Sequence, residues 1–255
     1  MTLAEFFATR YPPDTAYDWD NVGLQIGTLN KPITGVLIAL DVTDAVIDEA
    51  LEANANVIVS HHPLIFQPLK ALSTDAHKGK LIERLFKHDI AVYVAHTNYD
   101  VGDAGMNDVL AEKLNLKNTT IIDMVDETHG IGRIGTVDAM PLDDAIGYIK
   151  SKLGLSHARL ISATRDVTIR SIGLSGGSGS DSMAEAKRQG ADLYLTGDVT
   201  YHRAHDALAL GLPVLDIGHA TEKHFAEALA AELIDAGIDA PVQASAIDPD
   251  PFEIV

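Results

Sequence analysis

The sequence predicts an α/β protein with two similar halves and mostly parallel sheets. Three observations support this fold class: apolar runs alternate with helical patterns, the runs have the length of buried strands, and part of the pattern recurs in the second half. The candidate strands are GVLIALD at 35–41, NVIVS at 56–60, IAVYVAH at 90–96, SIGLSG at 171–176, ADLYLTG at 191–197 and LPVLDIG at 212–218. This alternation is typical of βαβ units, in which helices cover a buried parallel sheet.

Apolar residues at helical spacing lie between these runs. One apolar helical face is expected over 46–51 and a second over 106–114. The last helix is expected to begin near Thr221 and to stop at Gly237, because glycine is the usual residue just after a helix.

A repeat relates the two halves. EALEANANVIVSHH at 49–62 aligns without a gap on EAKRQGADLYLTGD at 185–198, and the strand at 90–95 matches the one at 212–217. We therefore expect domains at 1–127 and 128–255, joined around Thr128–Gly135. The C-terminal segment either belongs to the second half or packs back on the first.

Composition narrows the classes of function. The formal net charge of −18 opposes non-specific attraction to nucleic-acid phosphates, so a nucleic-acid partner is not expected. The sequence contains no cysteine, which excludes disulfides and thiolate metal sites, so imidazole and carboxylate would have to hold any metal. There is no long apolar run and no signal-peptide pattern at the start, so we expect a cytoplasmic protein that does not enter a membrane.

Histidines follow three of the predicted strands. His61 and His62 come after NVIVS, His96 follows IAVYVA, and His219 follows LPVLDI. Ligands of open α/β sheets bind beyond the carboxyl ends of the strands, where these histidines are placed. The alternative is a set of ordinary loop histidines.

A carboxylate accompanies two of these histidines. Asp100 comes four residues after His96, and Glu222 three residues after His219, spacings that direct both side chains to one side of a turn or helix start. With His61 and His62 this makes six groups, too many for one tetrahedral zinc but suited to two metals. A carboxylate in the first turn of a helix, such as Glu222, is also favoured by the helix dipole without any metal.

A two-metal site of imidazoles and carboxylates predicts hydrolysis, because paired ions acidify water and polarise a substrate oxygen. The ligand types accommodate zinc, iron, manganese, cobalt or nickel. The competing interpretation is a non-enzymatic protein that stores, delivers or senses divalent metal, or that docks on other proteins.

The loop SGGSGS at 175–180 is a candidate substrate-binding segment. Gly177, Ser178 and Gly179 would allow backbone N–H groups to approach a phosphate near a helix start. A tight turn that only connects two elements is the alternative.

Four further polar residues are candidates for supporting roles. Asp198 occupies the repeat position of His62, and we interpret Asp198 and His202 as catalytic groups that orient a ligand or substrate. Asp20 and Asn21 would position substrate or a ligand histidine; the alternative is that they cap a turn.

Seven motifs occur in order along the chain: WDNVGLQIG at 19–27, SHHPLIF at 60–66, AHTNYD at 95–100, GIGRIG at 130–135, SGGSGS at 175–180, TGDVTYH at 196–202 and GHATEK at 218–223. Together they resemble the Nif-three-like family, the bacterial GTP cyclohydrolase type 2 homologues. The length of 255 residues fits the short form, without the inserted mid-chain domain.

This resemblance implies a two-domain α/β fold and a dinuclear divalent-metal site in the cleft between the halves. It implies a homohexamer built as a trimer of dimers. Its metal ligands would be His61, His62, His96, Asp100, His219 and Glu222. The family name suggests opening of the guanine ring of GTP, and so a small, nucleotide-like or phosphorylated substrate.

Overall fold

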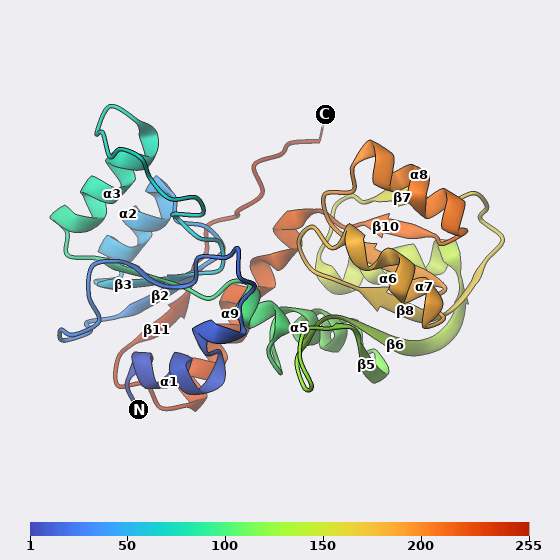
Figure 1. Ribbon diagram of the computed structural model, residues 1–255, viewed down its shortest axis with the longest axis horizontal. Helices are drawn as coiled ribbons and strands as arrows, with labels where there is room; N and C mark the ends of the chain where they lie inside the picture. Colours follow the sequence, from blue (N-terminus) through green and yellow to red (C-terminus); the bar gives the residue numbers. More distant parts are fainter. Residues whose placement is uncertain (255) are drawn as a thin grey trace. The chain divides into compact units, whose positions relative to one another are not determined.

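Residues 1–254 are described from a computed structural model (Figure 1). The chain forms two compact units. Unit 1 comprises Met1–Tyr99 together with the residues from Lys223 onward, and unit 2 comprises Asp100–Glu222. Each unit contains one β-sheet and several helices, which confirms the α/β class. No helix within residues 1–254 has both the length and the apolar character to cross a bilayer.

This division differs from the predicted domains 1–127 and 128–255. The expected joint at 128–135 lies instead at and around the start of strand β6 (Gly130–Pro141), which pairs with β5 (Lys117–Met124) inside unit 2. The C-terminal strand β11 (Val242–Ala244) pairs with β2 (Val36–Ala39) in unit 1. Strand pairing, which a linear pattern does not reveal, therefore decides both boundaries: β5 pairs with the next strand, β6, and β11 pairs with the distant β2.

The sheet of unit 1 has five strands in the order β1-β4-β3-β2-β11. Strands β2, β3 (Val57–Ser60), β4 (Ala91–Val94) and β11 run parallel, and β1 (Gly23–Ile26) is antiparallel to β4. Every residue of β2, β3 and β4 is buried. Continuous Val, Ile and Leu runs form such strands because both faces of the sheet are covered.

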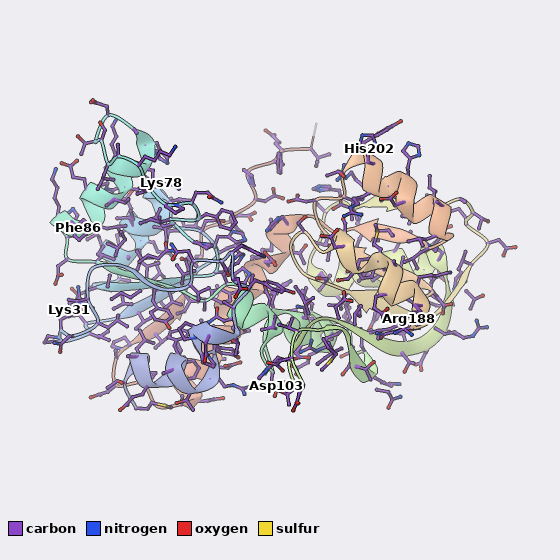
Figure 2. All side chains as sticks on the ribbon, viewed as in Figure 1. Lys31, Lys78, Phe86, Asp103, Arg188 and His202 are labelled. Atoms are coloured by element: carbon purple, nitrogen blue, oxygen red, sulfur yellow. The ribbon has the colours of Figure 1, made fainter. Side chains whose placement is uncertain are left out.

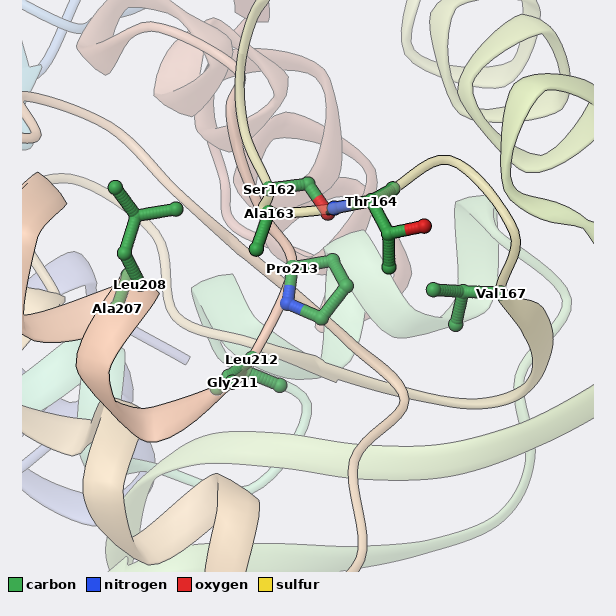
Figure 3. Close-up of a pocket in the computed structure, with 9 residues that line it drawn as sticks. All are labelled: Ser162, Ala163, Thr164, Val167, Ala207, Leu208, Gly211, Leu212 and Pro213. Carbon is green, nitrogen blue, oxygen red and sulfur yellow. Dashed lines mark hydrogen bonds between the residues drawn. The ribbon is translucent and has the colours of Figure 1, made fainter.

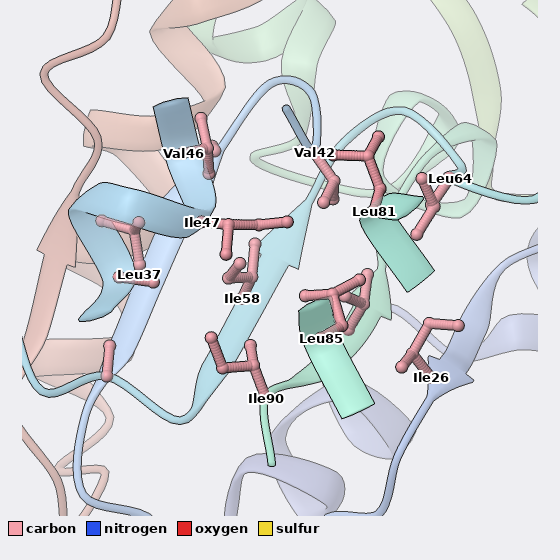
Figure 4. Close-up of a cluster of buried hydrophobic side chains, with 14 of the residues drawn as sticks. Ile26, Leu37, Val42, Val46, Ile47, Ile58, Leu64, Leu81, Leu85 and Ile90 are labelled. Carbon is pink, nitrogen blue, oxygen red and sulfur yellow. The ribbon is translucent and has the colours of Figure 1, made fainter. Parts of the chain in front are cut away.

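The helices of unit 1 are α1 (Leu3–Arg10), α2 (Asp44–Glu52), α3 (His77–Lys87), α9 (His224–Asp235) and the one-turn η1 (Pro13–Thr15). Ile47 of α2, Ile58 of β3 and Leu85 of α3 are fully buried in the main core cluster (Figure 4). Each such side chain contributes about 1.5–3 kcal/mol by burial. This core fixes the sheet whose strand ends carry the histidines.

The sheet of unit 2 has six strands in the order β5-β6-β8-β9-β10-β7. Strands β8 (Thr168–Leu174), β9 (Leu193–Thr196) and β10 (Val214–Asp216) are parallel, whereas β5, β6 and β7 (Arg159–Ile161) join by antiparallel pairing. The prediction of mostly parallel sheets is therefore wrong for this unit. Strand β5 is largely exposed, so it has no continuous apolar run from which to predict it.

The helices of unit 2 are α5 (Met106–Lys113), α6 (Leu142–Leu153), α7 (Met183–Arg188), α8 (Tyr201–Leu210) and the one-turn η2 (Ser180–Ser182). Two short helices carry the chain from one unit to the other, α4 (Thr97–Val101) and η3 (His219–Lys223).

Both sheets contain three successive parallel strands with an antiparallel strand beside the third. In unit 1 these are β2, β3 and β4, with β1 next to β4; in unit 2 they are β8, β9 and β10, with β7 next to β10. The aligned segments 49–62 and 185–198 contain β3 and β9, the middle strand of each set. The internal repeat of the two halves stays a prediction.

Candidate metal centre

Three histidines of unit 1 lie together at one edge of its sheet. Strand β3 ends just before His61 and His62, and β4 ends two residues before His96. Because β3 and β4 are adjacent and parallel, their carboxyl ends meet at the same edge. One ring nitrogen from each histidine lies within 4.8 Å of those of the other two, a separation compatible with shared metal ligation.

Asp20 orients the ring of His96. Its two carboxylate oxygens each lie 2.9 Å from His96 Nδ1, and Oδ2 also accepts hydrogen bonds from Thr97 N and Oγ1. Burial alone would raise the pKa of Asp20, but the hydrogen bonds from His96 and Thr97 outweigh it and lower the pKa to about 2. Asp20 is therefore an anion that accepts the Nδ1 proton of His96. Asp20 thus contacts His96, a predicted ligand. Positioning a ligand histidine was one of the roles that the sequence suggested for Asp20.

The other two histidines of unit 1 are oriented in the same manner. His62 Nδ1 lies 2.8 Å from Asp41 Oδ1, and His61 Nδ1 lies 2.9 Å from the carbonyl oxygen of Ala95. A carboxylate or carbonyl oxygen can only accept, so each Nδ1 carries the proton and Nε2 keeps the lone pair in the neutral ring. This tautomer presents Nε2 to a metal.

Unit 2 brings together the other three predicted ligands. His219 Nε2 lies 3.1 Å from Glu222 Oε2, a distance suited to two atoms on one ion. Carboxylate oxygens of Asp100 and Glu222 lie within 4.8 Å of each other, and both residues are buried. His219 Nδ1 lies 2.7 Å from Asp198 Oδ2, so Asp198 repeats the contact that Asp20 makes in unit 1.

Glu222 packs against the glycine-rich loop. Gly177 has a φ of +56°, and a Cβ placed on it would lie 2.8 Å from Glu222 Oε1. The N–H of Gly179 donates to Thr196 Oγ1 at 2.8 Å, and Ser178 is exposed. The close approach of a carboxylate explains the glycine at 177 without a phosphate. The substrate-binding role of 177–179 stays a prediction.

Asn21 is one residue from the His96 contact: its N–H donates at 2.7 Å to Asp20 Oδ1, the oxygen that also lies 2.9 Å from His96 Nδ1. Asn21 Nδ2 donates to the carbonyl oxygen of Ile65 at 2.6 Å. His202 is exposed on α8, with its ring 5.5 Å from that of Tyr201 (Figure 2). Across residues 1–254, no hydrogen bond joins His202 to another predicted site residue.

A small apolar cavity of about 90 Å³ lies elsewhere in unit 2. The loop after β7, the end of α8 and the turn before β10 line it (Figure 3). Its lining includes none of the predicted site residues, so we assign it no part in metal binding.

Residues 1–251 match the model of the family Duf34/NIF3 (NGG1p interacting factor 3). The chain belongs to this family. A Clostridium perfringens relative named "GTP cyclohydrolase 1 type 2 homolog" is 39% identical over 249 residues, covering 96% of this chain and 95% of its own length. The crystal structure of a Bacillus cereus protein related to NIF3 has a TM-score of 0.93 and 32% identity, covering 99% of this chain and 98% of that one.

A Bacillus subtilis relative of the same name is 31% identical and covers 91% of each chain. Its alignment runs over 339 residues, more than the 255 of this chain, so that relative contains sequence that this one lacks. This NIF3 protein is therefore a short form, as its length predicted.

Two polar residues that lie near the predicted ligands were not identified from the sequence. Asp41 follows the strand β2, the same strand-end signal that identified the histidines, so it was open to prediction. Asn107 is 1% exposed and gave no such signal. Its side chain donates to the carbonyl oxygen of Asp100 at 3.0 Å and accepts from Gly176 N at 3.1 Å. Asn107 therefore joins the backbone of Asp100 to the loop that packs against Glu222.

Proposed function

We propose that this NIF3 protein binds two divalent metal ions and hydrolyses a small, nucleotide-like or phosphorylated molecule. The proposed ligands are His61, His62, His96, Asp100, His219 and Glu222. One observation carries the proposal: the Nδ1 atom of every one of the four histidines lies against a carboxylate or carbonyl oxygen. Histidines that bind metal through Nε2 characteristically have this outer hydrogen bond.

We propose that both ligand sets belong to a single centre. The chain passes from unit 1 to unit 2 after Tyr99 and returns after Glu222. Asp100 and Glu222 therefore stand at the two crossings, and each follows a predicted ligand histidine by three or four residues. Asp100 and Glu222 are the groups that we propose to share ions with the three histidines of unit 1.

The donor set fits zinc, iron, manganese, cobalt or nickel, all of which accept imidazole and carboxylate. Divalent ions at such a centre supply Lewis acidity, which acidifies water and polarises a substrate oxygen. Asp20, Asp41 and Asp198 hold the imidazole rings in the ligating tautomer and increase their basicity. His202 is proposed to orient the substrate, as are Asn21 and the loop 177–179. The relatives' name, a homologue of a GTP cyclohydrolase, supports a nucleotide-like substrate.

A metal-binding protein that senses or delivers ions, or docks on other proteins, is the second candidate. The contacts of Asp20, Asp41 and Asp198 with histidine Nδ1 atoms favour this candidate. An aspartate that accepts a histidine proton does not serve as a separate proton donor to a substrate. Turnover distinguishes the two candidates.

We further propose a homohexamer, arranged as a trimer of dimers, in the cytoplasm. Light scattering coupled to size-exclusion chromatography should give six times the chain mass of 27.3 kDa. A mass of one or two chains would contradict this assembly.

The function is tested by metal analysis together with a hydrolysis screen. Protein purified without added metal, then reconstituted, is screened against a metabolite library beside the variants Asp100→Ala and Asp103→Ala. Asp103 is an exposed neighbour of Asp100 and is the matched control (Figure 2). We expect two ions per chain and a hydrolysed substrate in the wild type and Asp103→Ala, and loss of both in Asp100→Ala.

Well under one ion per chain, with none taken up on addition, would contradict metal binding itself. Two ions per chain without any hydrolysis would favour the second candidate.

A further inference from the structure

Aromatic side chains surround the ring of His96 in unit 1. The ring centroid of Trp19 lies 6.2 Å from that of His96, and that of Phe66 lies 6.5 Å away. The ring centroids of Trp19 and Phe66 lie 5.8 Å apart. Tyr17 stacks on Trp19, with ring centroids 5.6 Å apart and an interplanar angle of 18°. A predicted metal ligand therefore adjoins a cluster of stacked and tilted rings.

Two rings of this cluster, those of Trp19 and Phe66, are exposed. Trp19 is 57% exposed and Phe66 is 41% exposed, although large aromatic side chains contribute most to stability when buried. The part of Trp19 that Tyr17, Phe66 and His96 leave uncovered is available to a ligand.

The backbone holding these rings is fixed before any ligand binds. Gln25 Oε1 accepts a hydrogen bond from Ile65 N at 2.8 Å, and Asn21 Nδ2 donates to Ile65 O. These bonds tie the segment after Trp19 to the residue before Phe66. Tyr17 N donates to Thr97 Oγ1 at 3.1 Å, next to His96. A preorganised pair of rings loses little conformational entropy on binding.

We propose that Trp19 and Phe66 form a stacking site for a planar heteroaromatic ring, a purine base, of the ligand that acts at His96. The inference rests on the proposed function and names its substrate class. Rings stack with centroids about 4.5–7 Å apart, the range already found among Tyr17, Trp19 and Phe66. A sugar can also pack its C–H face against an aromatic ring, so a sugar phosphate without a base is the comparison that separates base stacking from sugar packing.

Trp19 is the only tryptophan of the chain, so its fluorescence reports on this site alone. Metal-free and metal-loaded protein are titrated with guanosine 5′-monophosphate and with ribose 5-phosphate, which lacks the base. We expect saturable quenching by the nucleotide and none by the sugar phosphate.

Calorimetric titration of variants then assigns the effect to the rings. Trp19→Leu and Phe66→Leu should each weaken nucleotide binding about 10-fold, because stacking on one ring has that magnitude, and Trp19→Phe should retain most of it. Phe86→Leu is the matched control, since Phe86 is 60% exposed on α3 (Figure 2) and is not among the ring contacts found for Trp19 and Phe66 in residues 1–254. It should bind the nucleotide like the wild type.

Equal quenching by both probes, or nucleotide affinity unchanged in Trp19→Leu and Phe66→Leu, would overturn the stacking site. So would a Trp19 emission that ignores the nucleotide but shifts with protein concentration, because a second copy of the chain would then cover the rings. These readouts need no turnover. Base-dependent binding without hydrolysis would leave the stacking site standing and contradict the hydrolase, whereas hydrolysis without base dependence would do the reverse.

Discussion

His96 Nδ1 lies 2.9 Å from both carboxylate oxygens of Asp20, a residue 76 positions earlier in the chain. This contact joins the segment before β1 to the end of β4 and sets the tautomer of a predicted metal ligand. Asp41 and Asp198 make the equivalent contact with His62 and His219. Three of the four histidines thus have a carboxylate partner, and the predictions below follow from that arrangement.

Asp20→Asn should weaken metal binding about 10- to 100-fold, because the amide no longer provides a charged acceptor for the proton of His96 Nδ1. Calorimetric titration of metal-free protein with zinc measures the change. Asp18→Asn is the control, because Asp18 is an exposed aspartate two residues away. Equal affinities for the two variants would show that Asp20 does not act through His96.

Asp41→Asn and Asp198→Asn should each weaken metal binding about 10-fold, the lower end of the same range. The effect should be smaller than for Asp20 because the side chains of Asp41 and Asp198 are 42% and 54% exposed. Asp144→Asn, an exposed substitution on α6, should leave the affinity unchanged. Competition against a chromogenic chelator measures all three. An effect in only one of the first two would limit the metal site to a single unit.

Gly177→Ala should displace the carboxylate of Glu222, since the new Cβ would lie 2.8 Å from Oε1. The fold should lose only about 1 kcal/mol, the usual cost of a left-handed backbone at alanine, while zinc affinity should fall at least about 10-fold. Gly154→Ala is the matched control, because its φ is +66° and nothing lies within 4 Å of the added Cβ. Both variants should unfold at similar urea concentrations, and only Gly177→Ala should lose metal. If both kept full zinc affinity, Glu222 would not be a ligand.

The stability of the metal-free protein should depend on Asp20 in acid. The pKa of Asp20 is lowered from 3.8 to about 2 in the folded protein, so the carboxylate stabilises the fold above pH 3.8. That contribution disappears as the pH falls from 3.8 toward 2. Near pH 5, Asp20→Asn should therefore be less stable than the wild type by about 1–2 kcal/mol, and the difference should vanish near pH 2. Urea denaturation at the two pH values measures it. A difference that grew in acid would contradict the assignment.

Local patterns in the sequence were enough to locate the strands that carry the histidines. The runs at 56–60 and 90–96 contain β3 and β4, because strands buried on both faces must be apolar throughout. Parallel pairing of those strands then places His61, His62 and His96 at one edge. The last helix was placed less accurately: the chain forms the one-turn η3 first, and α9 begins at His224.

Contacts between distant segments could not be predicted from local sequence patterns. The return of β11 to the first sheet depends on β2, far along the chain, so no local run predicted it. Strand β5 pairs with the next strand, β6, but it is largely exposed and so has no apolar run. The same holds for Asn107, whose polar side chain lies on an otherwise apolar helix face and acquires a role only where Asp100 and Gly176 meet it.

The sequence by itself determined the family, the α/β class and the residue types available for metal binding, because these follow from motifs, apolar runs and the absence of cysteine. Only the tertiary structure decided which oxygen faces each histidine. The partner of each histidine is fixed by a hydrogen bond, such as the one from His219 Nδ1 to Asp198 Oδ2 at 2.7 Å. The positions of the two residues in the sequence do not predict such a bond, because it forms only when the fold brings the side chains together.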